Sequence, residues 1–140
     1  MNRACTTPDR GECGIQRVVV GAAILRDGRV LSARRSAPAA LAGGWEFSGG
    51  KLEPGETPAA ALVRECREEL GVQIEVGALL AEAPIRDGLA LAVYGARLVA
   101  GEPRPLQDHD ELRWLGPDEL ADVDWLAPDR PAVVRLRELL

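Results

Sequence analysis

The pattern of hydrophobic and polar residues predicts four strands, which fall into two pairs. Residues 17–35 contain two apolar runs separated by Asp27-Gly28. Hydrophobic and polar residues alternate at residues 72–83 and 89–99, on either side of Asp87-Gly88. An Asp-Gly pair between two such stretches favours a tight hairpin turn. The pattern therefore predicts two β-hairpins.

A helical period replaces the alternation after residue 57. Thr57 and Pro58 suit the N-cap and first-turn positions of a helix, and Gly71 suits its left-handed end. At about 100° per residue, the apolar positions between them share one stripe. The residues of this expected stripe are Ala59, Leu62, Val63, Cys66 and Leu70.

The other segments predict a mixed architecture. Strands and helices interleave without regular βαβ alternation, which favours a mixed sheet between helices. In chain order, the remaining segments are a loop at 36–44, an extended piece at 45–47 that leads to a Gly49-Gly50 turn, a polar loop at 101–110, a strand at 112–115, a helical turn at 117–121 and an amphipathic helix at 130–140.

Length and composition set the domain organisation. The 140 residues are enough for one domain with a buried core, which we expect at residues 15–140. Residues 1–14 lack periodicity and are expected to form a flexible tail. No apolar run approaches 18 residues and no secretory signal is visible, so we expect a cytoplasmic protein without a membrane span. The net charge of −5 disfavours binding to a nucleic-acid polymer.

Acidic residues gather on the predicted helix. Glu65, Glu68 and Glu69 are spaced i, i+3, i+4, and like charges at that spacing repel one another. A cation beside them would relieve the repulsion, and carboxylate oxygens with substrate phosphate are typical magnesium ligands. The alternative is a solvated acidic face.

The spacing of residues around this cluster resembles a known family. Gly50, Glu56, Arg64-Glu65, Glu68-Glu69 and Gly71 fill the specified positions of the Nudix box. The preceding residues 45–51, WEFSGGK, are similar to those of MutT-like nucleoside triphosphate pyrophosphohydrolases. The resemblance implies an α/β/α sandwich and hydrolysis of a nucleoside triphosphate to the monophosphate and pyrophosphate.

The resemblance also implies roles for residues in the box. Glu65 is the expected general base, oriented by Arg64, and Glu69 is the alternative base. Glu56 is expected to hold the loop and the box together, with Gly49 and Gly71 as structural glycines. The expected cofactor is Mg²⁺, for which Mn²⁺ can substitute, and its implied ligands are Glu65, Glu69, Glu68 directly or through water, and a backbone carbonyl of Gly49 or Gly50.

Four residues outside the core of the box are further candidates. By resemblance, Asp108 lies where MutT-like enzymes place another catalytic carboxylate, although a solvated loop aspartate is the alternative. His109 is expected to contact the substrate or to be structural. Arg35 aligns with a phosphate-binding arginine, with neighbouring Arg34 or a plain surface role as alternatives. Lys51 follows the glycine pair and is placed to meet phosphate.

The base preference is expected to depend on Asp129. MutT-like proteins place an amide at this point to read a purine, whereas this chain has a carboxylate. An ionised carboxylate only accepts hydrogen bonds, so it favours the N4 amino group of cytosine in CTP, dCTP or 5-methyl-dCTP. The N7 proton of 8-oxo-dGTP is the alternative donor. Asp129 is also a good N-cap for the last helix.

Ser48 stands where MutT-like enzymes usually carry proline, so the expected turn loses a fixed φ. A non-catalytic regulatory domain is the alternative of another class, but such a domain predicts damage to the glutamate cluster, which is intact here. The expected partner is the nucleotide substrate, and a homodimer is left open.

Overall fold

The structure, a computed structural model, describes residues 17–140 as a mixed sheet with helices on both faces. The tail expected at residues 1–14 lies outside the described residues. The strands are β1 (Arg17–Arg26), β2 (Arg29–Arg35), β3 (Trp45–Glu46), β4 (Ser48–Lys51), β5 (Gln73–Arg86), β6 (Leu89–Ala100) and β7 (His109–Leu115). The helices are α1 (Pro58–Leu70), α2 (Arg130–Leu139) and the short 3₁₀ helices η1 (Leu120–Asp122) and η2 (Ala127–Asp129).

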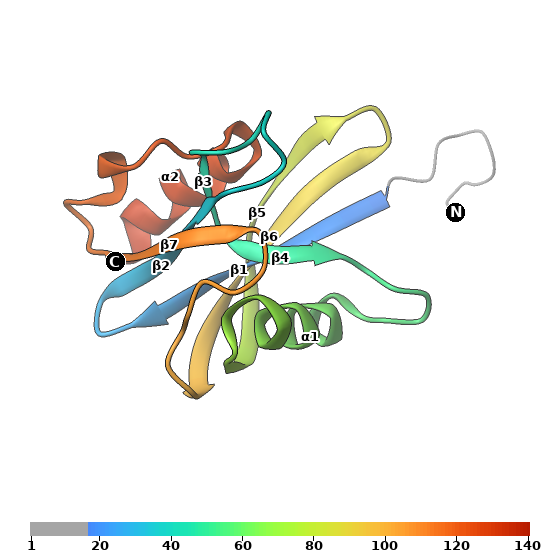
Figure 1. The fold of residues 1–140 in the computed structure, drawn as a ribbon, viewed down its shortest axis with the longest axis horizontal. Helices are drawn as coiled ribbons and strands as arrows, with labels where there is room; N and C mark the ends of the chain where they lie inside the picture. The colour runs from blue at the N-terminus through green and yellow to red at the C-terminus, as the bar shows by residue number, and fades with distance from the viewer. Residues whose placement is uncertain (1–16) are drawn as a thin grey trace.

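The seven strands form one sheet with β1 at its centre (Figure 1). Its main path runs β3-β2-β1-β6-β5, while β4 pairs with β1 and β7 pairs with β2. The β1 and β6 strands are parallel, and the other pairs are antiparallel. The sheet is therefore mixed, as the sequence predicted.

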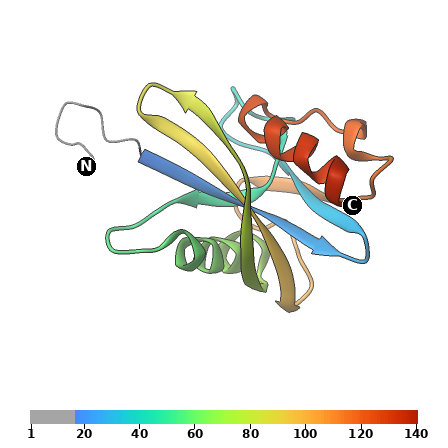
Figure 2. The same cartoon turned by 180° about the vertical axis from the view of Figure 1, so that it is seen from behind.

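Each face of the sheet carries its own core and its own helix. Val20, Ala22 and Ile24 of β1 pack with buried residues of α1, whereas Ala23 packs in a separate cluster with buried residues of α2. This division follows from the alternation of side chains along a strand. Figures 1 and 2 show the two helices on either side of the sheet, which confirms the α/β/α sandwich. Among the described residues, neither helix has the length and apolar content needed to cross a membrane.

Both predicted hairpins form, with longer strands than the pattern indicated. Asp27 and Gly28 have φ values of 53° and 74°, and Leu25 pairs with Val30 across this turn. The polar loop expected at 101–110 ends earlier than predicted, because β7 begins at His109 and pairs there with Arg35 of β2. This pairing is a tertiary contact that residues 101–110 alone do not encode.

The Gly49-Gly50 segment is a strand, not the expected turn. These glycines lie in β4, where they pair with Gly21 and Val20 of β1. A Cβ atom on Gly49 would overlap the carbonyl oxygen of Val20, and one on Gly50 would overlap the carboxylate of Glu65. The glycines are therefore needed for close packing. The neighbouring Ser48 is buried in the same strand, so the looser turn expected there does not arise.

The predicted box helix is confirmed, but one residue of its expected buried stripe is wrong. The Thr57 side chain accepts a hydrogen bond from the Ala60 amide at 3.1 Å, and Gly71 ends the helix with φ of 73°. Ala59 is exposed, whereas Ala61 is fully buried. The two positions are about 200° apart around a helix. The buried face of α1 therefore includes Ala61 in place of Ala59. Glu65 and Glu69 follow Ala61 at i+4 and i+8, so they lie near this buried face.

We predict that Gly49→Ala destabilises the fold while Gly21→Ala is tolerated. The added methyl at position 49 meets backbone, and overpacking of this kind costs roughly 1–3 kcal/mol or more. At Gly21 the nearest atoms lie at ordinary contact distances of 3.5 Å and beyond. Thermal or urea unfolding of the two variants checks this, and equal stabilities would contradict the packing role of Gly49.

Candidate active site

Arg64 is the centre of an ion-pair network at the start of the box. Its Nε and Nη2 donate to the Glu56 carboxylate at 2.8 and 3.0 Å, and Nη2 also donates to the Lys51 carbonyl at 3.1 Å. The Glu56 carboxylate accepts the Glu53 amide at 2.8 Å. The hydrogen bonds from Arg64 lower the pKa of Glu56 to about 2. Glu56 thus links the loop after β4 to α1.

The remaining nitrogen of Arg64 lies near two box glutamates. Arg64 Nη1 is 3.3 Å from Glu65 Oε2 and 3.5 Å from Glu68 Oε1. The Glu68 side chain is 46% exposed, whereas that of Glu65 is only 15% exposed. Arg64 therefore orients the buried carboxylate as expected, while Glu68 turns toward the solvent.

Glu65 and Glu69 place two partly buried carboxylates against β4. The Gly49 amide donates to Glu69 Oε1 at 3.2 Å, and the Glu65 carboxylate occupies the space left by the missing side chain of Gly50. Burial, with the charge of Glu65, raises the pKa of Glu69 to about 8. Burial also raises the pKa of Glu65, against the opposing effect of Arg64. Both groups would be stabilised as anions by a nearby cation.

The donor set of this region fits a hard divalent cation. Gly49 and Gly50 of β4 lie against these two glutamates, and the backbone carbonyls of both stay candidate ligands. Carboxylate and carbonyl oxygens are donors that Mg²⁺ accepts.

The expected three-glutamate cluster does not form a common site in this structure. Within residues 17–140, no three His, Cys, Asp or Glu side chains converge closely enough to hold an ion. Glu65 and Glu69 lie against β4, whereas Glu68 lies on the exposed side of α1 near Arg64. A cation here needs backbone, phosphate or water oxygens to complete its shell.

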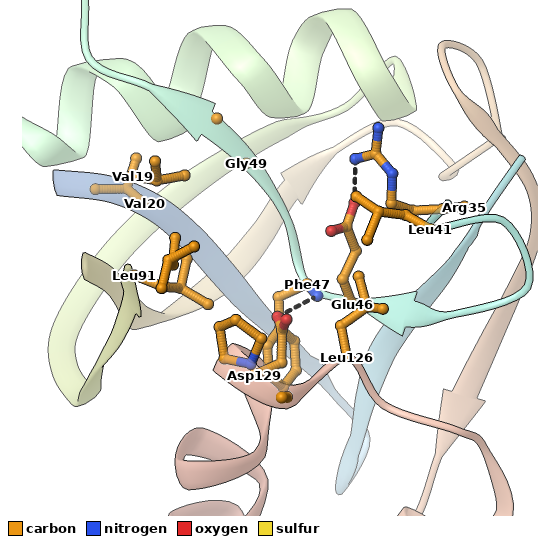
Figure 3. A pocket seen from close by; sticks show the side chains of 14 residues that line it. Val19, Val20, Arg35, Leu41, Glu46, Phe47, Gly49, Leu91, Leu126 and Asp129 are labelled. Carbon is orange, nitrogen blue, oxygen red and sulfur yellow. Dashed lines mark hydrogen bonds and ion pairs between the residues drawn. The ribbon is translucent and has the colours of Figure 1, made fainter. Parts of the chain in front are cut away.

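A cavity of about 420 Å³ lies next to the glycine segment of β4 (Figure 3). Gly49 and Gly50 form part of its wall, so it adjoins the box directly. Most of its wall is apolar, and its charged lining residues are Arg35, Glu46 and Asp129. The apolar side chains that line it are Val19, Val20, Leu41, Phe47, Ile85, Leu91, Leu126, Ala127 and Pro128.

Asp129 does not cap α2 with its side chain. Instead, its Oδ1 accepts a hydrogen bond from the Phe47 amide at 3.1 Å, as Figure 3 shows. The residue has helical dihedral angles and sits at the end of η2, so its side chain is directed to the cavity wall rather than to the next helix turn. Burial raises its pKa to about 7. Near neutral pH, this carboxyl group is able to donate as well as accept.

Arg35, Glu46 and His109 form a second charged network at the cavity. Glu46 Oε2 lies 2.9 Å from both Arg35 Nη1 and His109 Nε2. The His109 side chain is only 1% exposed, so in this structure it supports Glu46 and does not contact a substrate directly. Arg35 lines the cavity, whereas Arg34 points to the opposite face and pairs with Asp110 and Glu111. Of the two arginines predicted to bind phosphate, Arg35 is therefore the better placed to contact a ligand in the cavity.

The other two candidates lie outside this cavity. Asp108 is exposed, has φ of 47°, and contributes its carbonyl to a hydrogen bond from the Ser36 amide. The structure does not bring Asp108 into the wall of the cavity, and its catalytic role stays a prediction. Lys51 lines a neighbouring cavity instead.

Comparison with known proteins identifies the family. A model of the NUDIX domain matches residues 15–136, which is most of the chain. This chain belongs to the Nudix family. Nudix hydrolases in general use a divalent metal and act on nucleotides, in agreement with the oxygen donors at Glu65, Glu69 and the Gly49-Gly50 backbone.

Three relatives agree with this assignment. A Mycobacterium tuberculosis protein provisionally named 8-oxo-dGTP diphosphatase 2 is 42% identical, over 90% of this chain and 92% of its own length. The Escherichia coli CTP pyrophosphohydrolase is 40% identical, over 81% of this chain and 85% of its own. The crystal structure of a MutT Nudix hydrolase from Burkholderia pseudomallei has a TM-score of 0.75 and 35% identity, and the match covers 86% and 97% of the two chains. Their names confirm the hydrolase class.

Sequence reasoning missed Glu46, the residue that links Arg35 to His109 in this Nudix hydrolase. It also missed the apolar walls of the cavity, such as Phe47 and Leu126. A carboxylate between two aromatic residues in a short strand was the available signal, because Trp45 and Phe47 are buried while Glu46 points to the other side of the strand. The partners of Glu46 lie 11 and 63 residues away along the chain, which a local pattern does not reveal.

We predict that Asp129→Asn stabilises the free enzyme more at pH 8 than at pH 5. The folded-state pKa of about 7 lies above the ordinary value of 3.8, so the folded state binds more protons between these values. The free energy of unfolding therefore loses a contribution as pH rises toward about 7. The free energy of unfolding of the asparagine variant does not fall in this way as pH rises, because asparagine does not titrate.

Urea unfolding across this pH range measures the effect. Asp124→Asn is the matched control, because Asp124 lies five residues earlier and its side chain is 86% exposed. A difference between wild type and Asp129→Asn that does not change with pH would show that Asp129 keeps an ordinary pKa.

Proposed function

We propose that this Nudix hydrolase converts a nucleoside triphosphate to the monophosphate and pyrophosphate with Mg²⁺, and that cytidine nucleotides are preferred. The observation that carries the proposal is the shared wall at Gly49 and Gly50. On one side lies a cavity of about 420 Å³, within the range of small-ligand pockets. On the other side lie the carboxylates of Glu65 and Glu69. A nucleoside in the cavity thus directs its phosphates to the box.

The carboxylates of Glu65 and Glu69, with a backbone carbonyl of Gly49 or Gly50, would hold the cation. A bound Mg²⁺ neutralises phosphate charge and orients phosphate oxygens at the bond to be broken. Burial of both carboxylates strengthens their interaction with positive charge, because few water molecules screen it. The glycines keep the wall thin enough for the phosphates to approach.

We infer that Glu65 takes the proton from the attacking water. Arg64 Nη1 lies 3.3 Å from Glu65 Oε2 and fixes this carboxylate without neutralising it fully, because the same guanidinium also binds Glu56 with two nitrogens. Glu69 remains the alternative base. Its hydrogen bond from the Gly49 amide makes it better suited to hold the cation.

The cavity suits a flat base with an exposed amino group. Phe47 and Leu126 offer apolar contact to the ring, and among the described residues no amide or hydroxyl side chain lines the cavity. The polar lining groups that can accept hydrogen bonds are the carboxylates of Glu46 and Asp129. Carboxylates accept from the N4 amino group of cytosine, which favours CTP, dCTP or 5-methyl-dCTP.

A second candidate substrate is 8-oxo-dGTP. Two observations favour it: the relative named for this activity is 42% identical, and the pKa of Asp129 is raised to about 7. A protonated Asp129 donates to a purine carbonyl, whereas an ionised one accepts from the N7 proton of the oxidised base. Both candidates use the same catalytic residues.

We predict that Glu65→Gln lowers turnover far more than Glu68→Gln. Loss of the buried carboxylate removes a base and a cation ligand, so turnover should fall about 10²–10⁴-fold. Glu68 is exposed and its ion pair with Arg64 is worth at most about 1 kcal/mol, so its variant loses less than about fivefold. Pyrophosphate release with Mg²⁺ measures both. Equal losses of turnover in the two variants would show that Glu68 also takes part in catalysis.

We predict that Asp129→Asn shifts the preference from cytidine toward guanine nucleotides by about tenfold, because the amide both donates and accepts. The measurement is kcat/KM over a panel of CTP, dCTP, 5-methyl-dCTP, GTP, dGTP and 8-oxo-dGTP, with Asp124→Asn as control. An unchanged ranking would remove Asp129 from base recognition. A wild-type ranking with 8-oxo-dGTP first would select the second candidate.

A further inference from the structure

A second cavity, of about 400 Å³, lies where β1 begins and β4 ends, and positively charged side chains line it. Its charged lining residues are Arg17, Lys51 and Arg86, and within residues 17–140 no acidic side chain lines it. Its floor is apolar, made by Val18, Val19, Leu52 and Leu89. This concentration of cations stands out in a chain whose net charge is −5. Such a lining favours an anionic ligand.

The sheet register places these three cations on one face. Lys51 pairs with Val19, and Arg17 lies two residues before Val19 on the same strand. Arg17 pairs with Leu89, which in turn pairs with Arg86. Paired residues on neighbouring strands point to the same face, as do residues two apart on one strand. Four adjacent strands thus contribute to one surface.

This surface continues from the nucleoside cavity. Val19 lines both cavities, and Lys51 directly follows Gly50, which lines the first. At about 3.3 Å per strand residue, Arg17 lies roughly 7 Å beyond Val19 along β1. An extended ligand can therefore reach from one cavity into the other along β1.

The cations nearest to the box are already engaged by carboxylates. Arg64 binds Glu56, and Arg35 binds Glu46 at 2.9 Å. Additional negative charge on a substrate therefore needs partners elsewhere. We propose that Arg17, Lys51 and Arg86 form a second anion subsite that binds the distal phosphates of the substrate, beyond the bond that is cleaved. This inference rests on the proposed function and adds to it a preference for longer phosphate chains.

The first test measures chain-length preference. Arg17→Gln and Arg86→Gln should lower kcat/KM for cytidine 5′-tetraphosphate by roughly tenfold, and by less for CTP, because each removes a charge-assisted phosphate contact. Arg97→Gln is the matched control, since Arg97 pairs with Glu75 and its side chain is 65% exposed. Arg86→Lys should retain most of the tetraphosphate activity. An unchanged ratio of tetraphosphate to triphosphate in both glutamine variants would overturn the proposal.

The second test measures binding without catalysis. Titration calorimetry with inorganic tripolyphosphate, in the absence of nucleotide and divalent metal, should give binding to wild type and Arg97→Gln that weakens roughly tenfold in Arg17→Gln and Arg86→Gln. If this pattern holds while no nucleotide is hydrolysed, the subsite stands and the proposed function fails. If nucleotides are hydrolysed but tripolyphosphate binds all variants equally, the subsite fails and the function stands. Thermal melts confirm that the variants are folded.

Discussion

The packing of β4 against β1 and α1 depends on two residues without side chains. Gly49 leaves room for the backbone of β1, and Gly50 leaves room for the Glu65 carboxylate. Because β4 pairs with β1, the same glycine segment borders both the box glutamates and the cavity of about 420 Å³. A side chain at Gly50 would push Glu65 away from β4, and one at Gly49 would push β4 away from β1. The positions of the charged groups in the site therefore depend first on this close packing.

Charge is balanced unevenly around this segment. Glu56 is tied to Arg64, and Glu46 is tied to Arg35 and His109, so these carboxylates keep strong partners. By contrast, burial raises the pKa values of Glu65, Glu69 and Asp129. The second group gains most from a bound cation or nucleotide. Burial of these carboxylates costs stability in the free protein, and a bound cation would offset part of that cost.

The alternation of β1 explains why two distant parts of the chain meet at one site. One set of its side chains packs against α1, which carries the box glutamates. The other set packs toward α2 and the segment that ends in Asp129. Glu65 and Asp129 are 64 positions apart, yet Glu65 lies against Gly50 and Asp129 binds the nearby Phe47 amide. The sheet thus brings groups carried by opposite faces close to the same segment.

The sequence by itself determined the hairpins, the box helix with its caps, and the family. These features rest on local signals: the Asp27-Gly28 turn, the Thr57 cap, and glutamates at fixed spacing on one helix. The sequence also indicated Glu65, Glu69, Arg35 and Asp129, because the box and its neighbouring motifs carry these residues at characteristic spacings.

The tertiary structure alone decided how those residues are used. In the structure, Gly49-Gly50 lies in a strand and Glu68 faces the solvent. His109 is buried against Glu46, and the Asp129 side chain binds the Phe47 amide instead of capping α2. The fold also gathers Arg17, Lys51 and Arg86 from separate strands around one cavity. Each of these outcomes depends on strand register or helix rotation, which are set by contacts between segments far apart in the chain. A periodic pattern within one segment does not contain that information.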